Sequence, residues 1–520
     1  MVERIRCASL VLSVLSVGFL VSGILLLTFS DVIIKKAVKK ESQLKQGTVV
    51  YKLWRDSPVP YYISIYIFDL INEVDFLNGA KPQLIERGPF VYKEQRTKTD
   101  IRIYPNGTIS YRELRNYTFD RSKSSDDETY NITTVNVVYM TLVNYLLTQN
   151  VLSPVRSLIG LLLSTIEKPI MKRTVKEYLW GYRDPILGAL KDKFPSLVTN
   201  DQVSVFASAV DEAQYETYLI NNGVGFDANH TERIHDLGKI ERFNFSTSLS
   251  IWSNQYANMI NGTDSTIWHP DVSKDELVYS FMNDICRSVH LRFNQTHKNI
   301  FNIDVYRFTL PDDIFANSSD NEGFCTNIST SDKIKPLKCL PSGLFSLTPC
   351  LHLSGSAVSI PLPIIGSNPH FLATDQTVQD AILGLKPDDT QHRSYMELEP
   401  ITGIVMNGSR RMQFNINVVN DSKIGAIARI QPVVYPMIWV NEHAEIDQPN
   451  ANMFHKKVAV PLAVLAVLKY SFFAMGVTLF LTVIGLVIYS QYTKNRALVV
   501  VVDEPAAAAA VSDERTPLLE

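Results

Sequence analysis

Two long apolar stretches dominate the pattern of hydrophobic and polar positions. Residues 7–29, CASLVLSVLSVGFLVSGILLLTF, and residues 470–489, YSFFAMGVTLFLTVIGLVIY, contain no charged residue. At about 1.5 Å per residue, each is long enough as a helix to cross the roughly 30 Å hydrocarbon core of a bilayer. Tyr470 and Tyr489 bound the second stretch, as aromatic residues do at membrane interfaces. The pattern therefore predicts two transmembrane helices.

The first stretch could alternatively be a cleaved signal peptide. Its 23 residues exceed the apolar core of such peptides, about 7 to 15 residues, and no small-x-small cleavage motif closes it. We therefore expect an uncleaved anchor. Residues 1–6 and 490–520 then lie on one side of the membrane, and residues 30–469 form a large domain on the other.

Within the large domain, the apolar residues mostly alternate in the manner of strands. Residues 61–70, 88–113, 411–420 and 429–440 are rich in Tyr, Ile, Val and Phe, and Asn106–Gly107 marks a hairpin turn. Strands at both ends of the domain, with mixed elements between, predict a large antiparallel sheet or barrel.

Residues 134–179 break this alternation and are predicted to be helical. Residues 134–149 form one candidate helix, and Ser153–Pro154 begins a second. One face of the second helix carries an apolar stripe at helical spacing, made of Val155, Leu158, Ile159, Leu162, Leu163 and Ile166. The stripe can be the core of a helical bundle, which is the commoner case, or an exposed surface for a partner or a lipid.

The overall charge is close to balance. The chain is 46% hydrophobic with a net charge of −3. This balance argues against a nucleic-acid-binding protein, which would carry a basic excess.

Glycosylation sequons place the large domain in the lumen or outside the cell. Eleven Asn-x-Ser/Thr sequons lie between the two predicted spans and none lies in the tails. They are Asn106, Asn116, Asn131, Asn229, Asn244, Asn261, Asn294, Asn317, Asn327, Asn407 and Asn420.

The cysteines agree with this compartment. Cys286, Cys325, Cys339 and Cys350 cluster in the large domain, and an even number in an exported domain predicts two disulfides, with three pairings open. Cys7 lies at the edge of the first span, where it is a candidate for palmitoylation or a buried free thiol.

No catalytic or metal-binding motif is evident. The chain has no nucleophile elbow, no His-Glu-x-x-His and no Walker loop. Gly223 and Gly225 fit a turn better than a dinucleotide loop, and no carboxylate or cysteine completes a metal set with His230 and His235. We therefore expect no enzyme, no cofactor and no metal site.

Several segments resemble one family, the class B scavenger receptors with the lysosomal integral membrane proteins. The matching segments run in order along nearly the whole chain: DFLNGAKPQLIERGPFVYKE (75–94), EYLWGYRDPIL (177–187), NMINGTDSTIWHP (258–270), DICRS (284–288), YRFTLP (306–311), PHFLATD (369–375) and HRSYMELEPITGI (392–404). Within the family, FANSSDNEGFC (315–325) and the four luminal cysteines are most similar to the lysosomal branch.

The resemblance implies an α+β fold. It comprises a large antiparallel β-barrel-like ectodomain, a helical bundle at its apex and an internal apolar tunnel, anchored by two transmembrane helices. It implies lipid ligands such as cholesterol, phospholipid or fatty acid, and the disulfides Cys286–Cys350 and Cys325–Cys339. The ligand or partner surface would be the stripe Val155, Leu158, Ile159, Leu162 and Leu163, with Lys168 nearby.

The lysosomal branch also implies a second role, as a cargo receptor that carries the luminal hydrolase β-glucocerebrosidase on its apex helices and releases it in acid. The apex stretch 149–174 contains no histidine, so histidine-based release does not carry over to this chain. The lysine cluster of fatty-acid-binding members is also missing. The nearest candidates are Lys168, Lys172 and Arg173.

The C-terminal tail ends in a candidate sorting signal. Glu514, Leu518 and Leu519 fit the acidic dileucine pattern that clathrin adaptors read, and Pro517 keeps the segment extended. We therefore predict a lysosomal or late endosomal membrane protein with both termini in the cytosol.

Other hypotheses are a plasma-membrane scavenger receptor for lipoproteins or apoptotic cells, and a two-span channel. The second span carries only Thr478 and Thr482 as polar residues away from its ends, which disfavours a channel. A homo-oligomer is a further hypothesis.

Overall fold

The computed structural model describes residues 2–196, 198–206, 216–325, 339–353 and 360–502. The chain forms two compact units, which are described separately. One combines Met1–Ala37 with Asn452–Glu520, and the other is Val38–Ala451.

The first unit consists of long apolar helices. Helix α1 spans Val2–Ser42, and α10 (Gln448–Phe454) continues through a π-helical turn, His455–Ala459, into α11 (Val460–Val502). Both helical segments are long and apolar enough to cross a membrane, and both extend beyond the apolar stretches 7–29 and 470–489.

Small residues allow α1 and α11 to pack closely. A Cβ on Gly23 would lie 2.7 Å from the backbone of Phe473, and one on Gly476 would lie 2.7 Å from Leu20. The Ser16 hydroxyl donates to the carbonyl of Gly476 at 3.0 Å. Close approach at small residues and a hydroxyl hydrogen bond are the usual means by which helices associate in lipid.

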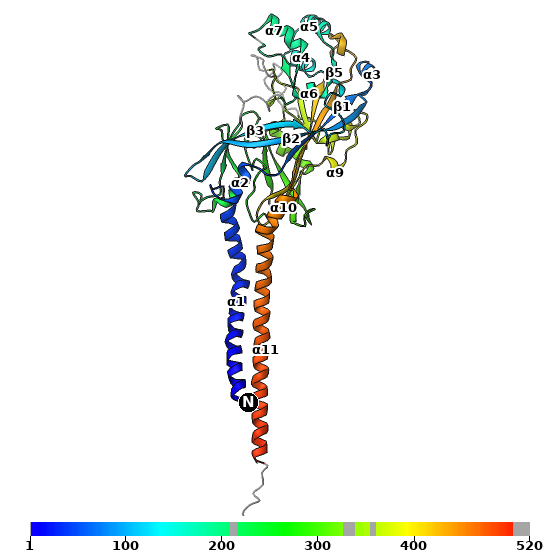
Figure 1. The fold of residues 1–520 in the computed structure, drawn as a ribbon. Coiled ribbons are helices and arrows are strands. Elements are labelled where there is room, and N and C mark those ends of the chain that lie inside the picture. The colour runs from blue at the N-terminus through cyan, green and yellow to red at the C-terminus, as the bar shows by residue number, and fades with distance from the viewer. Residues whose placement is uncertain (1, 197, 207–215, 326–338, 354–359, 503–520) are drawn as a thin grey trace, which may run out of the picture. The chain divides into compact units, whose positions relative to one another are not determined.

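The second unit is built on one sheet of thirteen strands with antiparallel neighbours (Figure 1). Its main path runs β10-β11-β12-β15-β16-β17-β1-β2-β3-β8-β9, and β13 pairs with β14, which pairs with β16. The strands are β1 (Tyr61–Leu70), β2 (Leu84–Ile103), β3 (Thr108–Phe119), β8 (Thr217–Asn221), β9 (Ile240–Phe243), β10 (Val278–Met282), β11 (Arg287–Lys298), β12 (Asp304–Thr309), β13 (Leu344–Ser346), β14 (Ile364–Ser367), β15 (Tyr395–Leu398), β16 (Val405–Val418) and β17 (Val433–Glu445).

The sheet is nearly closed, because a short segment bridges its two edge strands. The amide of Ile240 at the start of β9 donates to the Gly262 carbonyl at 2.9 Å. On the other side, the amide of Thr263 donates to Tyr279 of β10 at 3.2 Å, and Phe281 donates back to Thr263 at 3.0 Å. Closure leaves little exposed strand edge, and it confirms the predicted large antiparallel, barrel-like sheet.

The predicted hairpin joins β2 to β3. The amide of Tyr104 donates to the Thr108 carbonyl at 2.9 Å, and Gly107 adopts a φ of +80°. Only glycine takes that conformation without a steric cost, which explains the Asn-Gly pair at this turn.

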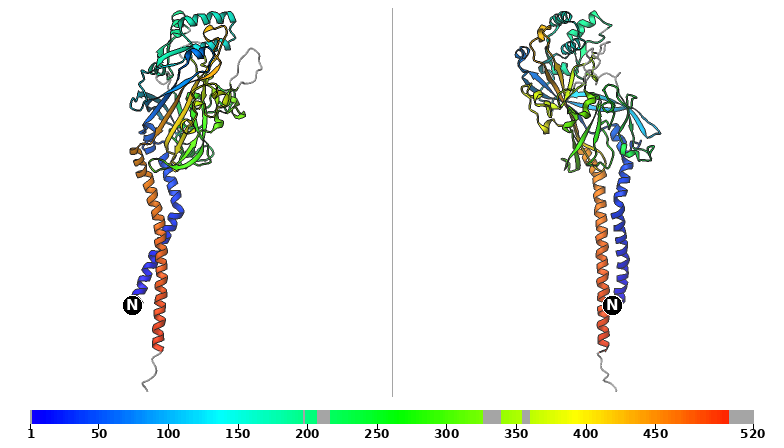
Figure 2. Two further views of the ribbon diagram at one scale, coloured as in Figure 1. Left: turned by 90° about the vertical axis from the view of Figure 1, so that its right-hand side faces the viewer. Right: turned by 180° about the vertical axis from the view of Figure 1, so that it is seen from behind.

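Helices gather at the end of the sheet opposite α2 (Val49–Arg55) (Figures 1 and 2). They are α4 (Val137–Thr148), α5 (Ser153–Ile166), α6 (Val175–Trp180) and α7 (Pro185–Lys193). Shorter helices are α2 (Val49–Arg55), α3 (Glu73–Leu77), α8 (Gln376–Gln379) and α9 (Asp389–His392).

The predicted helical segment 134–179 is interrupted by strand. Strand β4 (Asn131–Val135) overlaps its start, and β5 (Ile170–Thr174) pairs with β4 inside it. Pro169 explains the break, because proline cannot continue a helix and its predecessor avoids helical angles. Thr174 and Glu177 then form a capping box that starts α6 anew. A further pair of two-residue strands, β6 (Tyr182–Arg183) and β7 (Gln202–Val203), completes this end.

Candidate functional site

Helix α5 presents an apolar face to solvent. Leu158 and Leu162 are 58% and 51% exposed, although both lie in a regular helix of a folded unit. We define the α5 apolar face as the exposed residues Leu152, Val155, Leu158, Leu161, Leu162 and Ile166. A contiguous apolar arc of this kind marks an interaction surface on a soluble domain.

The opposite side of α5 holds the helix in place. Gly160 is buried, and a Cβ there would lie 3.0 Å from the side chain of Ile424. Arg156 forms an ion pair with the buried carboxylate of Asp421 at 2.8 Å. The apolar face is therefore carried on a helix that is fixed from behind.

This arrangement corrects the sequence interpretation in two ways. Of the two alternatives for the stripe, bundle core is wrong for Val155, Leu158, Leu162 and Ile166, which are exposed. Leu163 is only 5% exposed and Ile159 is half-buried, so neither belongs to the open part of the predicted surface. Two exposed leucines were missed: Leu152 precedes the predicted helix start at Ser153, and Leu161 lies beside the stripe rather than within it.

Charged groups near α5 are mostly paired with each other. Lys168 is exposed, Lys172 lies 3.8 Å from Glu73, and Arg173 contacts Glu167 at 3.3 Å. These pairs leave the α5 apolar face bordered by largely neutralised charge rather than by a basic patch.

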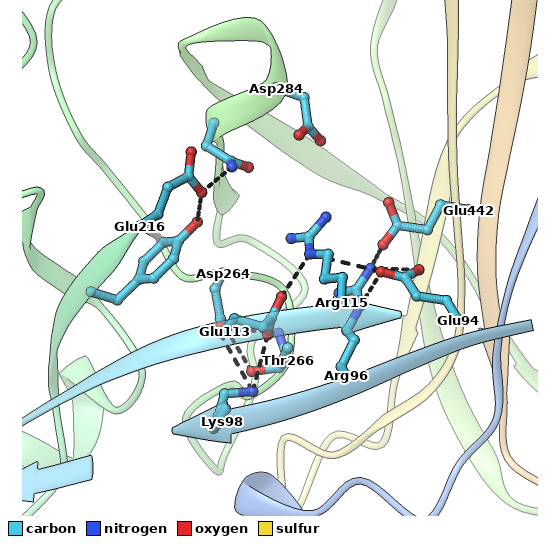
Figure 3. A network of polar contacts seen from close by, with 12 residues as sticks. Glu94, Arg96, Lys98, Glu113, Arg115, Glu216, Asp264, Thr266, Asp284 and Glu442 are labelled. Carbon is cyan, nitrogen blue, oxygen red and sulfur yellow. Dashed lines mark hydrogen bonds and ion pairs between the residues drawn. The ribbon is translucent and has the colours of Figure 1, made fainter. Parts of the chain in front are cut away.

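A buried network of charges lies on β2 and β3 (Figure 3). Glu94, Arg96 and Lys98 alternate along β2, and Glu113 and Arg115 alternate along β3. Residues two apart share a face of a strand, and the register places Lys98 opposite Glu113 and Arg96 opposite Arg115. All five side chains therefore point to one side of the sheet.

Acidic groups separate the two opposed guanidinium groups. Arg96 donates to Glu94 at 2.9 Å and contacts Glu442 of β17, while Arg115 donates to Glu113 at 2.9 Å. Burial alone would raise the pKa of Glu113, but Arg115 and Lys98 outweigh it and hold that pKa well below its usual range.

The network joins strands that are far apart in the sheet order. Lys98 lies 3.9 Å from Asp264, and Arg410 of β16 pairs with Asp284 at 2.8 Å. Asp284 follows β10, at the far end of the path from β3. These contacts are what near-closure of the sheet makes possible, so the network helps to hold the sheet closed.

Glu216 is a carboxyl of this network whose pKa is raised into the physiological range. Burial and the nearby Asp284 raise the pKa of Glu216 to about 7, against a smaller opposing effect of Arg115. Tyr218 donates to it at 3.3 Å, and the Asn283 amide also contacts it. Glu216 is therefore poised to gain a proton in a mildly acidic compartment.

The structure places the other predicted residues as follows. Cys286 pairs with Cys350, and Cys325 with Cys339, which is the pairing that the family resemblance implies. Cys7 is a free, exposed thiol. Glu514, Pro517, Leu518 and Leu519 lie outside the described residues, as does Asn327.

The sequon asparagines are accessible throughout the described part of the large domain. Eight are exposed: Asn106, Asn116, Asn131, Asn229, Asn244, Asn294, Asn317 and Asn420. Asn261 and Asn407 are half-buried. In the described ranges, no group of three or more metal-ligating side chains comes together.

Comparison with known proteins identifies a family that matches most of the chain. The sequence pattern of the CD36 family matches residues 14–487. The chain belongs to the CD36 family.

Individual family members match over almost the whole chain. Lysosome membrane protein 2 of Mus musculus is 32% identical, covering 91% of this chain and 93% of its own length. The same protein of Homo sapiens is 30% identical, covering 99% of both chains. Scavenger receptor class B member 1 of Rattus norvegicus is 29% identical, covering 94% of this chain and 91% of its own. These family members are named as a membrane protein and as receptors.

Proposed function

We propose that the protein is a lysosomal or late endosomal membrane receptor that captures lipid on the α5 apolar face and passes it through the interior of the ectodomain to the membrane. This proposal rests on the exposed leucines of α5. Leucine side chains in water contribute little to the stability of the fold, and they contribute free energy to binding when an apolar ligand covers them. Each CH₂ group removed from water contributes about 0.8 kcal/mol to binding.

The nearly closed sheet and the membrane helices support the second step. A lipid that travels within an enclosed protein path avoids the cost of exposing its chain to water at each step. The proposed tunnel, and the choice among cholesterol, phospholipid and fatty acid, rest on the family resemblance.

The experiment measures lipid transfer by the full-length protein in proteoliposomes. We expect Leu158→Ser with Leu162→Ser to reduce capture of fluorescent cholesterol or phosphatidylcholine from donor vesicles at least fivefold. Ser164→Ala with Thr165→Ala, on exposed polar positions of the same helix, is the matched control. Equal transfer by both variants and the unmodified protein would refute capture on α5.

A cargo receptor for a luminal hydrolase such as β-glucocerebrosidase is the second candidate. The α5 apolar face also favours this role, because an apolar helix face can dock against a helix of a partner protein. Pull-downs at pH 7 and pH 5 with the same two variants separate the roles. Stoichiometric hydrolase that is lost on Leu158→Ser with Leu162→Ser supports cargo binding. Bound lipid without a hydrolase supports transfer.

We further propose that both termini are cytosolic and that Val38–Ala451 is luminal. The exposed sequon asparagines support this orientation, since glycans are added on the luminal side. In this orientation Cys7 is accessible for palmitoylation, and the tail can meet clathrin adaptors. A plasma-membrane scavenger receptor would share the topology but not the destination.

The destination is tested on the tail. We expect Leu518→Ala with Leu519→Ala to move the protein from lysosomes to the cell surface, because adaptors bind dileucine side chains in apolar pockets. Thr516→Ala, at a position that the acidic dileucine pattern leaves open, is the matched control. Microscopy with surface biotinylation measures the shift, and unchanged lysosomal residence would contradict the sorting signal.

A further inference from the structure

Arg287 is a buried cation without a matching anion. It begins β11, inside the segment Asp284–Ser288, and only 3% of it is exposed. Its Nη2 donates to the Ile314 carbonyl at 2.5 Å and to the Asn321 Oδ1 at 2.8 Å. The guanidinium carbon lies 3.6 Å from the centre of the Phe324 ring.

These contacts leave the charge only partly compensated. Among the residues that the structure describes, no carboxylate forms an ion pair with Arg287, and its buried Nε has no hydrogen-bond acceptor. Burial lowers the pKa of Arg287 to about 9. Arg96 and Arg115, which are also buried, are both surrounded by carboxylates. Buried charges are normally paired, so Arg287 differs in this respect from Arg96 and Arg115.

A cavity of about 80 Å³ lies against this guanidinium. Its walls include Arg292, His290, Tyr256 and Tyr279. The His290 Nε2 is buried and has no hydrogen-bond partner in the described structure. Burial and the nearby Arg292 lower the pKa of His290, so its neutral ring can offer an N–H donor to a ligand.

The acidic groups at the cavity do not supply the missing charge. Asp313 is paired with Arg292 at 2.8 Å, and Asp320 is exposed on the 3₁₀ turn Ser319–Phe324. The cavity therefore combines one guanidinium without a described carboxylate partner, one imidazole nitrogen without a described hydrogen-bond partner, and aromatic walls.

We propose that this cavity binds a small oxyanion, a carboxylate or a phosphate, with Arg287 as its counter-charge. Guanidinium groups favour these anions because their planar N–H donors match the oxygen geometry. The anion can be a free solute or the headgroup of a lipid. The cavity contains no residue of the α5 apolar face, so the test of anion binding is independent of lipid capture on α5.

The test measures the thermal unfolding midpoint of the full-length protein in detergent at constant ionic strength. Sodium acetate and inorganic phosphate replace sodium chloride in one arm, and palmitate or phosphatidate in mixed micelles is added in the other. We expect a saturable rise in the midpoint in at least one arm. A rise in the first arm identifies a free anion, and a rise only in the second identifies a headgroup.

Two variants tie the effect to the cavity. Arg287→Lys keeps a charge but loses the planar donors, and it should weaken the apparent affinity at least tenfold. Arg292→Gln, at the half-exposed rim, should weaken it severalfold and keeps the test available if the first variant does not fold. Arg429→Lys, an exposed arginine elsewhere, is the matched control. No saturable rise with any probe, or equal rises in all variants, would overturn the proposal.

Discussion

The β2–β3 network and the α5 apolar face both depart from the usual rule that charged side chains lie in solvent and apolar side chains lie in the core. The network buries charged side chains inside the large sheet, whereas α5 exposes leucines to water. Both arrangements cost free energy in isolation. The network recovers its cost through internal pairing, because each buried cation on β2 and β3 meets a carboxylate. The exposed face of helix α5 lies in water without such pairing, and we propose that a ligand covers it.

This difference separates stability from recognition. Changes in the network should alter the stability of the fold, and changes on the α5 apolar face should alter binding with little effect on the fold. Three predictions test this separation.

The largest effect is expected from Arg96→Met. The side chain of Arg96 is 8% exposed, and its loss removes one of the two cations that pair with each of two buried carboxylates, leaving Glu94 with Arg115 alone and Glu442 with Arg410 alone. Breaking a buried ion pair costs about 3–5 kcal/mol. Thermal and denaturant unfolding of the detergent-solubilised protein should show this loss. Arg242→Met, at an exposed position on β9, is the control and should change stability by less than about 1 kcal/mol.

An intermediate effect that depends on pH is expected from Glu216→Gln. The folded pKa of about 7 lies above the reference value of 4.5, so the folded protein binds more protons between these pH values. Protonation of Glu216 therefore adds stability as pH falls below 7, and that contribution is lost as pH rises through 7. The contribution is up to about 3 kcal/mol, from about 1.36 kcal/mol per pKa unit.

The measurement is the unfolding midpoint at pH 5 and pH 7.5. Glu216→Gln should raise the midpoint at pH 7.5 relative to the unmodified protein and have a much smaller effect at pH 5. The exposed Glu445→Gln controls for a general change of charge. An equal shift at both pH values would mean that Glu216 does not titrate in this range.

The smallest effect on stability is expected from Leu158→Ser with Leu162→Ser. Both side chains are already largely in water, so their removal should change the free energy of unfolding by no more than about 0.5 kcal/mol each. Unfolding of the same preparation used for the transfer assay measures this. A loss of several kcal/mol would show that the face supports the fold, and the contrast with the network would fail.

The sequence predicted the elements of both regions better than their environments. The helical spacing of Val155, Leu158 and Leu162 correctly indicated a helix. The same spacing is produced by a bundle core and by an exposed docking face, so burial could not be deduced from it. Tertiary contacts such as the packing of Gly160 against Ile424 and the Arg156–Asp421 ion pair decide which side of α5 faces inward.

The network was missed for a related reason. The alternation of Glu94, Arg96 and Lys98 signals one face of a strand, and a charged face ordinarily lies in solvent. Its burial depends on Glu442, Asp264 and Asp284, which come from distant parts of the chain. Local pattern contains no information about such partners, whereas the Asn106–Gly107 hairpin is set by neighbouring residues and was predicted correctly.

The short segment between β9 and β10 is the place where the sheet closes. Gly262, with a φ of +88°, lies so close to β10 that a Cβ would fall 2.0 Å from the Tyr279 carbonyl. Only glycine fits there, and it stands between the asparagine and threonine of the Asn261 sequon. The hydrogen bonds of Gly262 and Thr263 form the main-chain link between the two edge strands of the sheet. We therefore expect any widening of the interior of the sheet to begin with the separation of Gly262 and Thr263 from β10, next to the glycan that Asn261 can carry.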